Sequence, residues 1–409
     1  MSVIKPFRAL RPRPDLAEKI ACVPYDVPYD SEVREYIADN PQSFLRVTRP
    51  EAEFPLGSKP SDADVLAKSK ENLEKFISEG WLQQDAEPSI YIYRLSIGPH
   101  VQTGIVAACS IDEYDAGLIK KHEKTRPDKV KDRTDHMVYL GAQTGLIFLA
   151  FRGTDETRRI VTEETSREPL FECPCDAGGV TQTVWKVSDV DGFVAAFAQL
   201  PALYVADGHH RAESASLARK TLKEQNPNHT GDEPYNFVMA SVFPAEDLKI
   251  LPYNRAVKDL NGLTKEEFLE SLSHSFSVEP ADAKLPPHPR SFAMYLDGKW
   301  SKLTYIVENI QQPNPIESLD VSILQQNILA PILGIDDPRT NDRVSFVGGI
   351  RGTDELERLV DSGDYAVAFS MYPTSMDDLF AVSDMGEIMP PKSTWFEPKL
   401  KDGLFVHLI

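Results

Sequence analysis

The chain has 409 residues, of which 41% are hydrophobic and 26% are charged. These values are those of an ordinary globular protein, and they exclude a disordered chain, a fibrous repeat and a disulfide-stapled miniprotein. Its 44 Lys and Arg residues against 63 Asp and Glu residues give a formal net charge of −19. Because such a surface repels phosphate backbones at long range, binding of nucleic acid is disfavoured.

In chain order, the first half predicts helices over 31–39 and 62–80, strands over 90–97, 105–111, 146–152 and 181–187, and a helix over 191–199. The second half predicts a strand over 202–206, a helix over 209–225, a strand over 237–243, a helix over 265–273, strands over 292–296 and 302–307, a helix over 319–333, a strand over 344–347, a helix over 353–362, a strand over 365–371 and a helix over 375–385. Asp297-Gly298 gives the strongest hairpin signal. This order predicts an α+β class with mixed sheets.

The N-terminal segment is basic but lacks the apolar core and cleavage site of a secretory signal. No stretch approaches the roughly 20 apolar residues that cross a bilayer. We therefore expect a cytoplasmic protein with no membrane partner. Cys173 and Cys175 form a CxC pair without a second Cys/His pair at finger-like spacing, so their binding of a metal stays an open alternative.

The sharpest feature is LYVADGHHRAESA, residues 203–215, in which an apolar strand turns into a helix. Gly208 allows the turn and the close approach of a ligand. The helix N-terminus offers free N–H groups and a partial positive charge, which suit an anion. Arg211 can bind a phosphate in a fork geometry, and Asp207 can hold Mg²⁺ or accept a hydroxyl proton.

His209 and His210 complete this segment and can donate hydrogen bonds or move protons near neutral pH. The alternative is structural: Asp207 caps the helix and the histidines lie on the surface. Capping does not explain why His-His-Arg occupies a first turn in which positive charge opposes the helix dipole. The pattern therefore favours a functional anion site.

A second feature is basic. Residues 120–133 contain seven Lys and Arg and three acidic residues, a local excess of +4. Such a loop-like run is either a solvated face or a clamp for a phosphorylated small molecule. As a clamp it would close over the 207–211 loop, with Glu123 as base or Mg²⁺ ligand and three further side chains as phosphate ligands: His122, Arg126 and Arg133.

A third feature lies near the C-terminus, where two prolines precede Lys392, Ser393 and Thr394. Prolines preset the backbone, and these side chains suit phosphate oxygens. The alternative is a segment anchored to the core by Trp395 and Phe396. The sequence contains no GxxxxGK[ST], GxGxxG, GxSxG or HExxH pattern, which disfavours P-loop, Rossmann, α/β-hydrolase and zincin chemistry.

Asp207-Gly208-His209-His210-Arg211 after an apolar strand resembles the signature of the ParB/sulfiredoxin-like fold, which includes partition proteins, sulfiredoxins and free serine kinases. The resemblance implies that Asp207, His210 and Arg211 contact metal or phosphate. Five motifs in order resemble the bacterial family called domain of unknown function 1015: HEKTRPDKVKDR, ADGHHRAESA, LPYNRAV, MPPKSTWFEPKL and KDGLF. Strands rather than a helix-turn-helix follow the ADGHHR helix, which disfavours chromosome partitioning.

We therefore expect an N-terminal lobe over 1–190, a ParB/sulfiredoxin-like core over 191–262 and a C-terminal lobe over 263–409. The resemblance implies phosphoryl-group chemistry on a small hydroxylated metabolite, such as nucleotide-dependent phosphorylation of serine, with ADP or ATP and Mg²⁺ as cofactors. A phosphatase at the same site and a non-catalytic nucleotide-binding protein remain alternatives. The substrate and the oligomeric state stay open.

Overall fold

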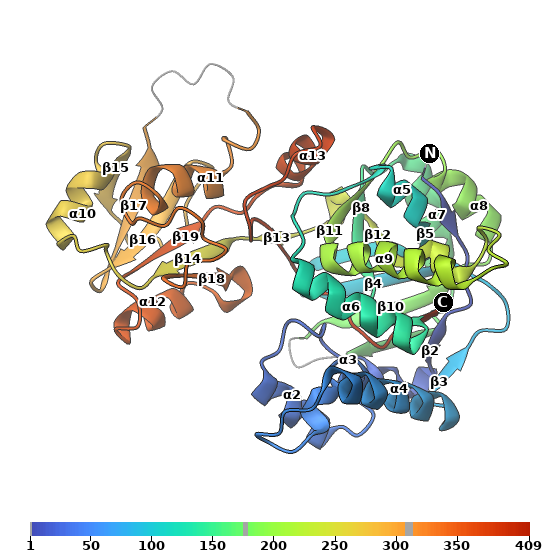
Figure 1. The fold of residues 1–409 in the computed structure, drawn as a ribbon. Coiled ribbons are helices and arrows are strands. Elements are labelled where there is room, and N and C mark those ends of the chain that lie inside the picture. Colours follow the sequence, from blue (N-terminus) through green and yellow to red (C-terminus); the bar gives the residue numbers. More distant parts are fainter. Residues whose placement is uncertain (1, 175–178, 307–313) are drawn as a thin grey trace. The chain divides into compact units, whose positions relative to one another are not determined.

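The computed structural model describes residues 2–174, 179–306 and 314–409 (Figure 1). Cys175 and the last residue of the strand expected over 302–307 lie outside these residues. The chain forms two compact units. The first comprises residues 1–121, 125–248 and 398–409, and the second comprises residues 122–124 and 249–397. No helix in the described part of the chain has the length and apolar character needed to cross a membrane.

The first unit is built on a sheet. Its strands are β1 (Ile4–Lys5), β4 (Tyr91–Ile97), β5 (His100–Ser110), β6 (Ile119–Lys120), β8 (Ile147–Phe151), β9 (Phe171–Pro174), β10 (Thr181–Lys186), β11 (Leu203–Asp207) and β12 (Phe237–Pro244). The described strands follow the order β6-β11-β8-β12-β5-β4-β10-β9, and β1 also pairs with β5. β8 and β12 are parallel neighbours and almost wholly buried, which explains their continuous apolar sequences.

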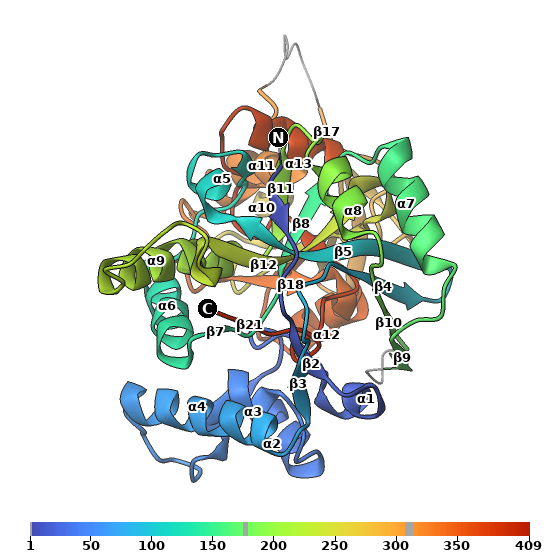
Figure 2. The same ribbon diagram turned by 90° about the vertical axis from the view of Figure 1, so that its right-hand side faces the viewer.

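Helices cover this sheet. They are α5 (Ile111–Asp115), α6 (Pro127–Leu140), α7 (Asp155–Thr165), α8 (Val190–Phe197) and α9 (His209–Gln225). α9 packs beside α6 in both views (Figure 1, Figure 2). Its core-facing stripe consists of Ala212, Ala215 and Ala218, small enough for close approach. Ser214 Oγ also donates to the carbonyl of Val130, at 2.9 Å, and ties the two helices together.

The sequence predicts a loop-like segment over residues 120–136. This prediction is wrong from Pro127 onwards, where helix α6 begins. Pro127 occupies the first helical turn, where its missing N–H costs nothing. Gly141 ends the helix in the left-handed conformation, with φ 64°. Val130 and Met137 are buried on one face of this helix, and the charged residues lie mostly on the other faces. The high charge of the segment concealed a narrow apolar stripe.

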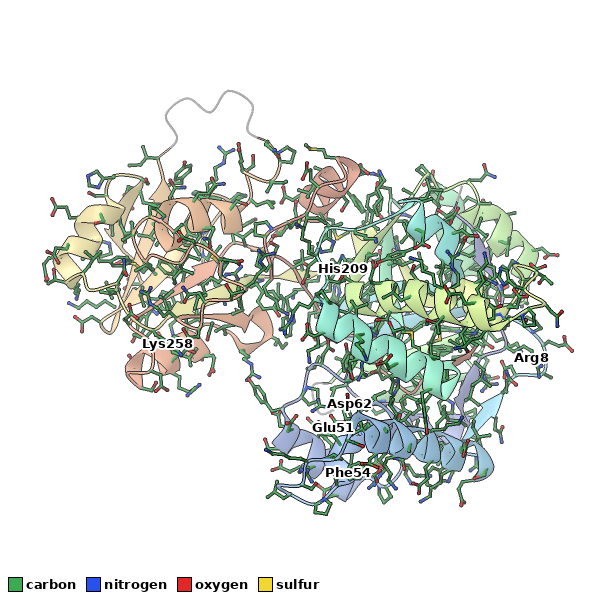
Figure 3. The ribbon with its side chains drawn as sticks, viewed as in Figure 1. Arg8, Glu51, Phe54, Asp62, His209 and Lys258 are labelled. Carbon is green, nitrogen blue, oxygen red and sulfur yellow. The ribbon has the colours of Figure 1, made fainter. Side chains whose placement is uncertain are left out.

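A helical layer precedes the sheet in sequence and belongs to the same unit. It contains β2 (Leu10–Pro12), α1 (Ala17–Ile20), α2 (Asp30–Asp39), α3 (Leu45–Thr48), α4 (Asp62–Ser78) and β3 (Leu82–Gln84). Asp62 marks the start of α4 (Figure 3). Phe44, Leu73 and Phe76 form much of its separate hydrophobic core. Near the other end of the chain, β21 (His407–Leu408) pairs with β7 (Ala142–Gln143) and ties the C-terminus to this unit.

His136 and His407 are two of the buried histidines of the first unit. His136 Nε2 lies 2.9 Å from Ser69 Oγ and so links α6 to α4. His407 Nε2 lies 3.2 Å from the carbonyl oxygen of Pro234. Burial lowers the pKa of each imidazole to about 4.

We expect these histidines to make the protein less stable as the pH falls from about 6.5 to about 4. In this window the unfolded chain binds protons at both rings and the folded chain does not, so each ring removes up to about 1.4 kcal/mol per pH unit. Urea unfolding of the parent and of His136→Asn across this window measures the slope. The slope should be shallower in the variant and unchanged in His274→Gln, whose ring is exposed. Equal slopes in His136→Asn and the parent would contradict the assignment.

The second unit has its own sheet, with the described strands in the order β15-β17-β16-β19-β14-β18. Its elements are β13 (Ile250–Leu251), β14 (Tyr253–Val257), α10 (Lys265–Leu272), β15 (Phe276–Pro280), β16 (Ser291–Leu296), β17 (Lys299–Tyr305), α11 (Asp320–Leu324), β18 (Val344–Gly348), α12 (Asp354–Asp361), β19 (Val367–Met371), α13 (Met376–Asp384) and β20 (Trp395–Phe396). The predicted hairpin joins β16 to β17, with Asp297 at φ 51° and Gly298 at φ 73°.

Helices and sheets in both units confirm the α+β class. The sheet of the first unit is mixed, whereas the described strand pairs of the second unit's main sheet are antiparallel. The division of the chain differs from the boundaries expected at 190 and 262. β11 and β12 lie inside the sheet made by strands of the first 190 residues, because β11 pairs with β8 and β12 pairs with both β8 and β5. The segment 191–248 is therefore part of the first unit.

Candidate functional site

The DGHHR segment forms a tight turn between β11 and α9. β11 ends at Asp207, and Gly208 adopts the left-handed conformation, with φ 91°. A Cβ atom at this position would lie 3.3 Å from Arg211 Nε and 3.4 Å from Ile147 Cα. Glycine is therefore required both by the backbone angle and by the space available. Gly208 occupies the N-cap position of α9 and has no side chain to cap the helix.

Asp207 is not the cap that the structural alternative required. Its Oδ1 atom accepts from the N–H of Gly208 at 2.8 Å, and its Oδ2 atom accepts from Lys399 Nζ at 2.7 Å. Burial by itself raises the pKa of Asp207, but Lys399 and Arg211 outweigh it and hold the pKa well below the usual range. The carboxylate is therefore a permanent anion, suited to hold a cation or a hydroxyl rather than to store a proton.

Lys399 is a site residue that the sequence reasoning did not select. It lies 192 residues from Asp207 in sequence, within one of the family-like motifs, but nothing in its local pattern indicated this partner. Its side chain is 19% exposed, and that of Asp207 is 36% exposed. The pair is thus open to a ligand while part of each side chain is shielded from water.

Arg211 has partners behind the turn. It is buried, and its Nη1 atom donates to the carbonyl of Leu146 and lies 3.9 Å from Asp402 Oδ1. Burial opposes the charge on Arg211, but Asp402 and Asp26 outweigh it and raise the pKa. These contacts give Arg211 a role in holding the turn of Gly208 against β8.

Asp402 belongs to the KDGLF motif and was also missed. It is buried, and its Oδ2 atom accepts from the N–H of Tyr25 at 3.3 Å. Burial raises the pKa of Asp402 to about 7, against the opposing effect of Arg211. Arg133 reaches the same cluster from α6, with its guanidinium 4.4 Å from the centre of the Tyr25 ring. Arg133 thus lies beside the buried ionic cluster behind the turn.

The start of α6 is joined to the start of α9. The main-chain N–H of Arg126 donates to His210 Nε2 at 3.0 Å. When the His210 ring is neutral, its proton therefore sits on Nδ1. The Arg126 guanidinium pairs instead with Asp128 and is 70% exposed. The basic segment therefore contacts the DGHHR turn through its backbone, whereas the expected inward orientation of the Arg126 side chain is not what the structure shows.

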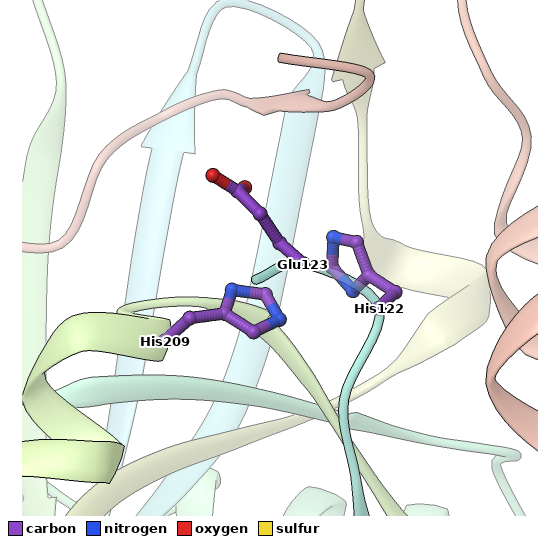
Figure 4. Close-up of side chains that lie close together, drawn as sticks. All are labelled: His122, Glu123 and His209. Carbon is purple, nitrogen blue, oxygen red and sulfur yellow. The ribbon is translucent and has the colours of Figure 1, made fainter. Parts of the chain in front are cut away.

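His209 occupies the first position of α9, and its ring is buried (Figure 3, Figure 4). His122 and Glu123 follow β6 and pack with the second unit. Within that unit, His122 Nε2 lies 3.3 Å from Thr394 Oγ1, and the His122 carbonyl accepts from the N–H of Met389 at 2.8 Å. The structure thus brings together His122 and Thr394, two predicted site residues that are far apart in sequence.

The neighbouring residues of the PPKST segment are held by the second unit. Lys392 has φ 57°, and its Nζ atom lies 5.5 Å from the centre of the Tyr253 ring. Ser393 is buried and donates to the carbonyl of Pro390 at 2.6 Å. The buried guanidinium of Arg255 donates to two carbonyls of this segment, at 3.2 and 3.1 Å. These bonds fix the loop, as the prolines had suggested.

Comparison with known proteins assigns this sequence to a family. Residues 4–322 match the family model described as protein of unknown function (DUF1015). The chain belongs to this family. The match confirms the resemblance that the five motifs carry, and it includes the DGHHR turn, although it ends before Lys399 and Asp402. No curated protein matches the DUF1015 chain significantly.

Several solved structures resemble the DUF1015 chain at low identity. A free serine kinase in complex with AMP is 12% identical, with a TM-score of 0.35, over 74% of this chain and 91% of the kinase. A conserved hypothetical protein from Pyrococcus furiosus is 14% identical, with a TM-score of 0.34, over 75% and 95%. C-terminally truncated SbnI from Staphylococcus aureus is 14% identical, with a TM-score of 0.40, over 74% and 87%.

Proposed function

We propose that the DUF1015 chain transfers a phosphoryl group from a nucleotide, ADP or ATP, to a hydroxyl of a small metabolite such as serine. The observation that carries the proposal is the ion pair of Asp207 and Lys399 beside the N-terminus of α9. Phosphoryl transfer needs positioning, cationic donors and a metal ligand rather than covalent catalysis. All three requirements have a candidate at this turn.

Phosphate binding is assigned to the backbone and to Lys399. The first N–H groups of α9 point out of the helix and carry the positive end of its dipole. Gly208, at φ 91°, turns the chain from β11 into α9 and so brings these groups beside Asp207. Lys399 Nζ adds a positive charge beside the turn. Arg211 supports this arrangement by holding the turn from behind, through Leu146 and Asp402.

Asp207 suits Mg²⁺, which prefers hard oxygen ligands and is held by one or two carboxylates together with substrate phosphates. Its permanent negative charge fits that role. Bound there, Mg²⁺ would supply charge neutralisation at the phosphate oxygens. The imidazoles of His209 and His210 are not ligands of this class, so we assign His210 to hydrogen bonding at the reacting groups.

Glu123 is assigned as the base that takes the proton of the attacking hydroxyl. Chain length limits its position: Glu123 and Arg126 are three positions apart, so their Cα atoms lie at most about 11 Å from each other. The N–H of Arg126 is bonded to His210, at the start of α9. A carboxylate within this reach can serve the turn as general base.

We expect Lys399→Met to weaken ADP binding by about 10- to 100-fold, because a charged hydrogen bond contributes about 1.5–3 kcal/mol. Isothermal titration calorimetry with ADP measures the affinity. Lys223→Met is the matched control, because Lys223 is exposed in the last turn of α9, away from the DGHHR turn at its start. An ADP affinity equal in Lys399→Met and the parent would place the nucleotide elsewhere.

A further inference from the structure

The first unit contains a pocket of about 170 Å³ at the end of the sheet that lies away from Asp207. β8 runs antiparallel to β11, with Phe148 opposite Asp207. Phe151, three residues further along β8, lines the pocket, about 10 Å from Phe148 at the rise of an extended strand. The pocket and the DGHHR turn therefore occupy opposite ends of the same strands.

The walls of this pocket are largely apolar. They include Ile105, Phe151, Val161, Phe197 and Val242. Polar side chains complete the lining, among them Thr103, Thr157 and Thr162. For scale, an enclosed apolar cavity of about 150 Å³ takes up benzene. The pocket therefore has room for one compact apolar group, contributed on the protein side by β5, β8, β12, α7 and α8.

A guanidinium also lines the pocket. Arg94, on β4, donates through Nε to Thr103 Oγ1 at 3.0 Å and lies 4.8 Å from the centre of the Trp185 ring. Within the described residues, no ion pair joins Arg94 to a carboxylate. Burial lowers the pKa of Arg94. A half-buried cation of this kind is stabilised when an anion binds beside it.

A carboxylate lines the same pocket. Asp247, which follows β12, is partly buried, and burial raises its pKa. Asp247 accepts a backbone hydrogen bond from Thr103, and the charge of Arg158 acts with this bond against the effect of burial on its pKa. Arg158 forms its ion pair with Glu246, at 3.5 Å. The pocket therefore presents a cation, a carboxylate and an apolar wall within one small volume.

We propose that this pocket binds a small α-amino acid with an apolar side chain. Arg94 binds its carboxylate, Asp247 binds its ammonium group, and the apolar wall receives its side chain. This site is independent of the proposed phosphoryl transfer at the DGHHR turn. A zwitterion fits because a simple acid would face Asp247 and a simple amine would face Arg94.

The parent protein tests this ligand chemistry directly by titration calorimetry with L-leucine, 4-methylpentanoate, 3-methylbutylamine and L-serine. We expect L-leucine to bind and the other three to bind about tenfold more weakly or worse. 4-Methylpentanoate has no ammonium group for Asp247, 3-methylbutylamine has no carboxylate for Arg94, and L-serine has no apolar side chain for the wall. The absence of leucine binding at millimolar concentration would overturn the proposal, as would equal binding of 4-methylpentanoate or of L-serine.

Variants test the location. Arg94→Met keeps the contact with Trp185 and should weaken leucine binding by about tenfold or more. Arg159→Met is the control, because Arg159 is half exposed on α7 and bonded to Glu156 and Glu163. Asp247→Asn should weaken leucine binding in the same way and provides the test if Arg94→Met does not fold. Unchanged binding in a folded variant of Arg94 or Asp247 would overturn the proposal.

Competition separates this site from the DGHHR turn. ADP should leave the leucine affinity unchanged, and Lys399→Met should bind leucine as the parent does. If ADP displaces leucine, the two ligands share one site and the proposal of a separate pocket is wrong. If leucine binds and ADP does not, the amino-acid site stands and the proposed nucleotide site fails.

Discussion

Arg211→Met is expected to lower the free energy of unfolding by about 3–5 kcal/mol, the range for removing one partner of a buried ion pair. The variant leaves the Asp402 carboxylate buried without its cation and removes the donor to the carbonyl of Leu146. Urea unfolding followed by circular dichroism measures the loss. The control is Arg159→Met, whose side chain is 53% exposed and whose partners Glu156 and Glu163 are exposed as well; it should lose much less, because an exposed ion pair adds little to stability.

A second substitution distinguishes the ion pair from simple packing. Arg211→Met combined with Asp402→Asn should recover part of the loss, because no buried charge remains and the amide oxygen can still accept from the N–H of Tyr25. The single variant should also be more damaged at alkaline than at acidic pH. The pKa of Asp402 is raised in the folded state, so its contribution is favourable below the unfolded pKa and is lost as the pH rises through about 7. A double variant less stable than the single one would contradict this account.

Asp207→Asn is expected to lower the rate of phosphoryl transfer by about 10²- to 10³-fold, the effect of losing one preorganised electrostatic group. ADP should still bind, because the backbone N–H groups of α9 and Lys399 remain in place. Turnover of ADP or ATP with L-serine and Mg²⁺ measures the rate, and calorimetry measures the affinity. Asp191→Asn, at an exposed position of α8, is the control. Full turnover in Asp207→Asn would show that Asp207 has no role in the reaction.

Local patterns predicted much of the fold. The strand, glycine turn and helix around Gly208 follow from an apolar run, a residue free to adopt positive φ and a helical stripe, and all three are present. The hairpin at Asp297-Gly298 was equally clear. α6 and α7 were not found, because charged and threonine residues surround the few buried positions, such as Ile160 of α7.

The partners in the candidate site could not be predicted in the same way. Asp207 was selected from its own surroundings, but Lys399 and Asp402 reach the turn only because the C-terminal segment returns to the first unit. That return depends on long-range backbone pairing, such as the isolated antiparallel β-bridge between Cys22 and Asp402. A single sequence contains no local signal for contacts across almost 400 residues, whereas the chemistry proposed for the turn rests on residue types that are adjacent in the sequence.

The most direct test of the central claim is ³¹P NMR of the parent protein incubated with ADP or ATP, Mg²⁺ and L-serine or a panel of other small hydroxylated metabolites. The account predicts a new phosphomonoester resonance that requires the nucleotide, the metal and the hydroxyl compound, and that is lost in Asp207→Asn. Nucleotide that binds but yields no phosphorylated product with any member of the panel would contradict it and would leave a nucleotide-binding protein without transferase activity.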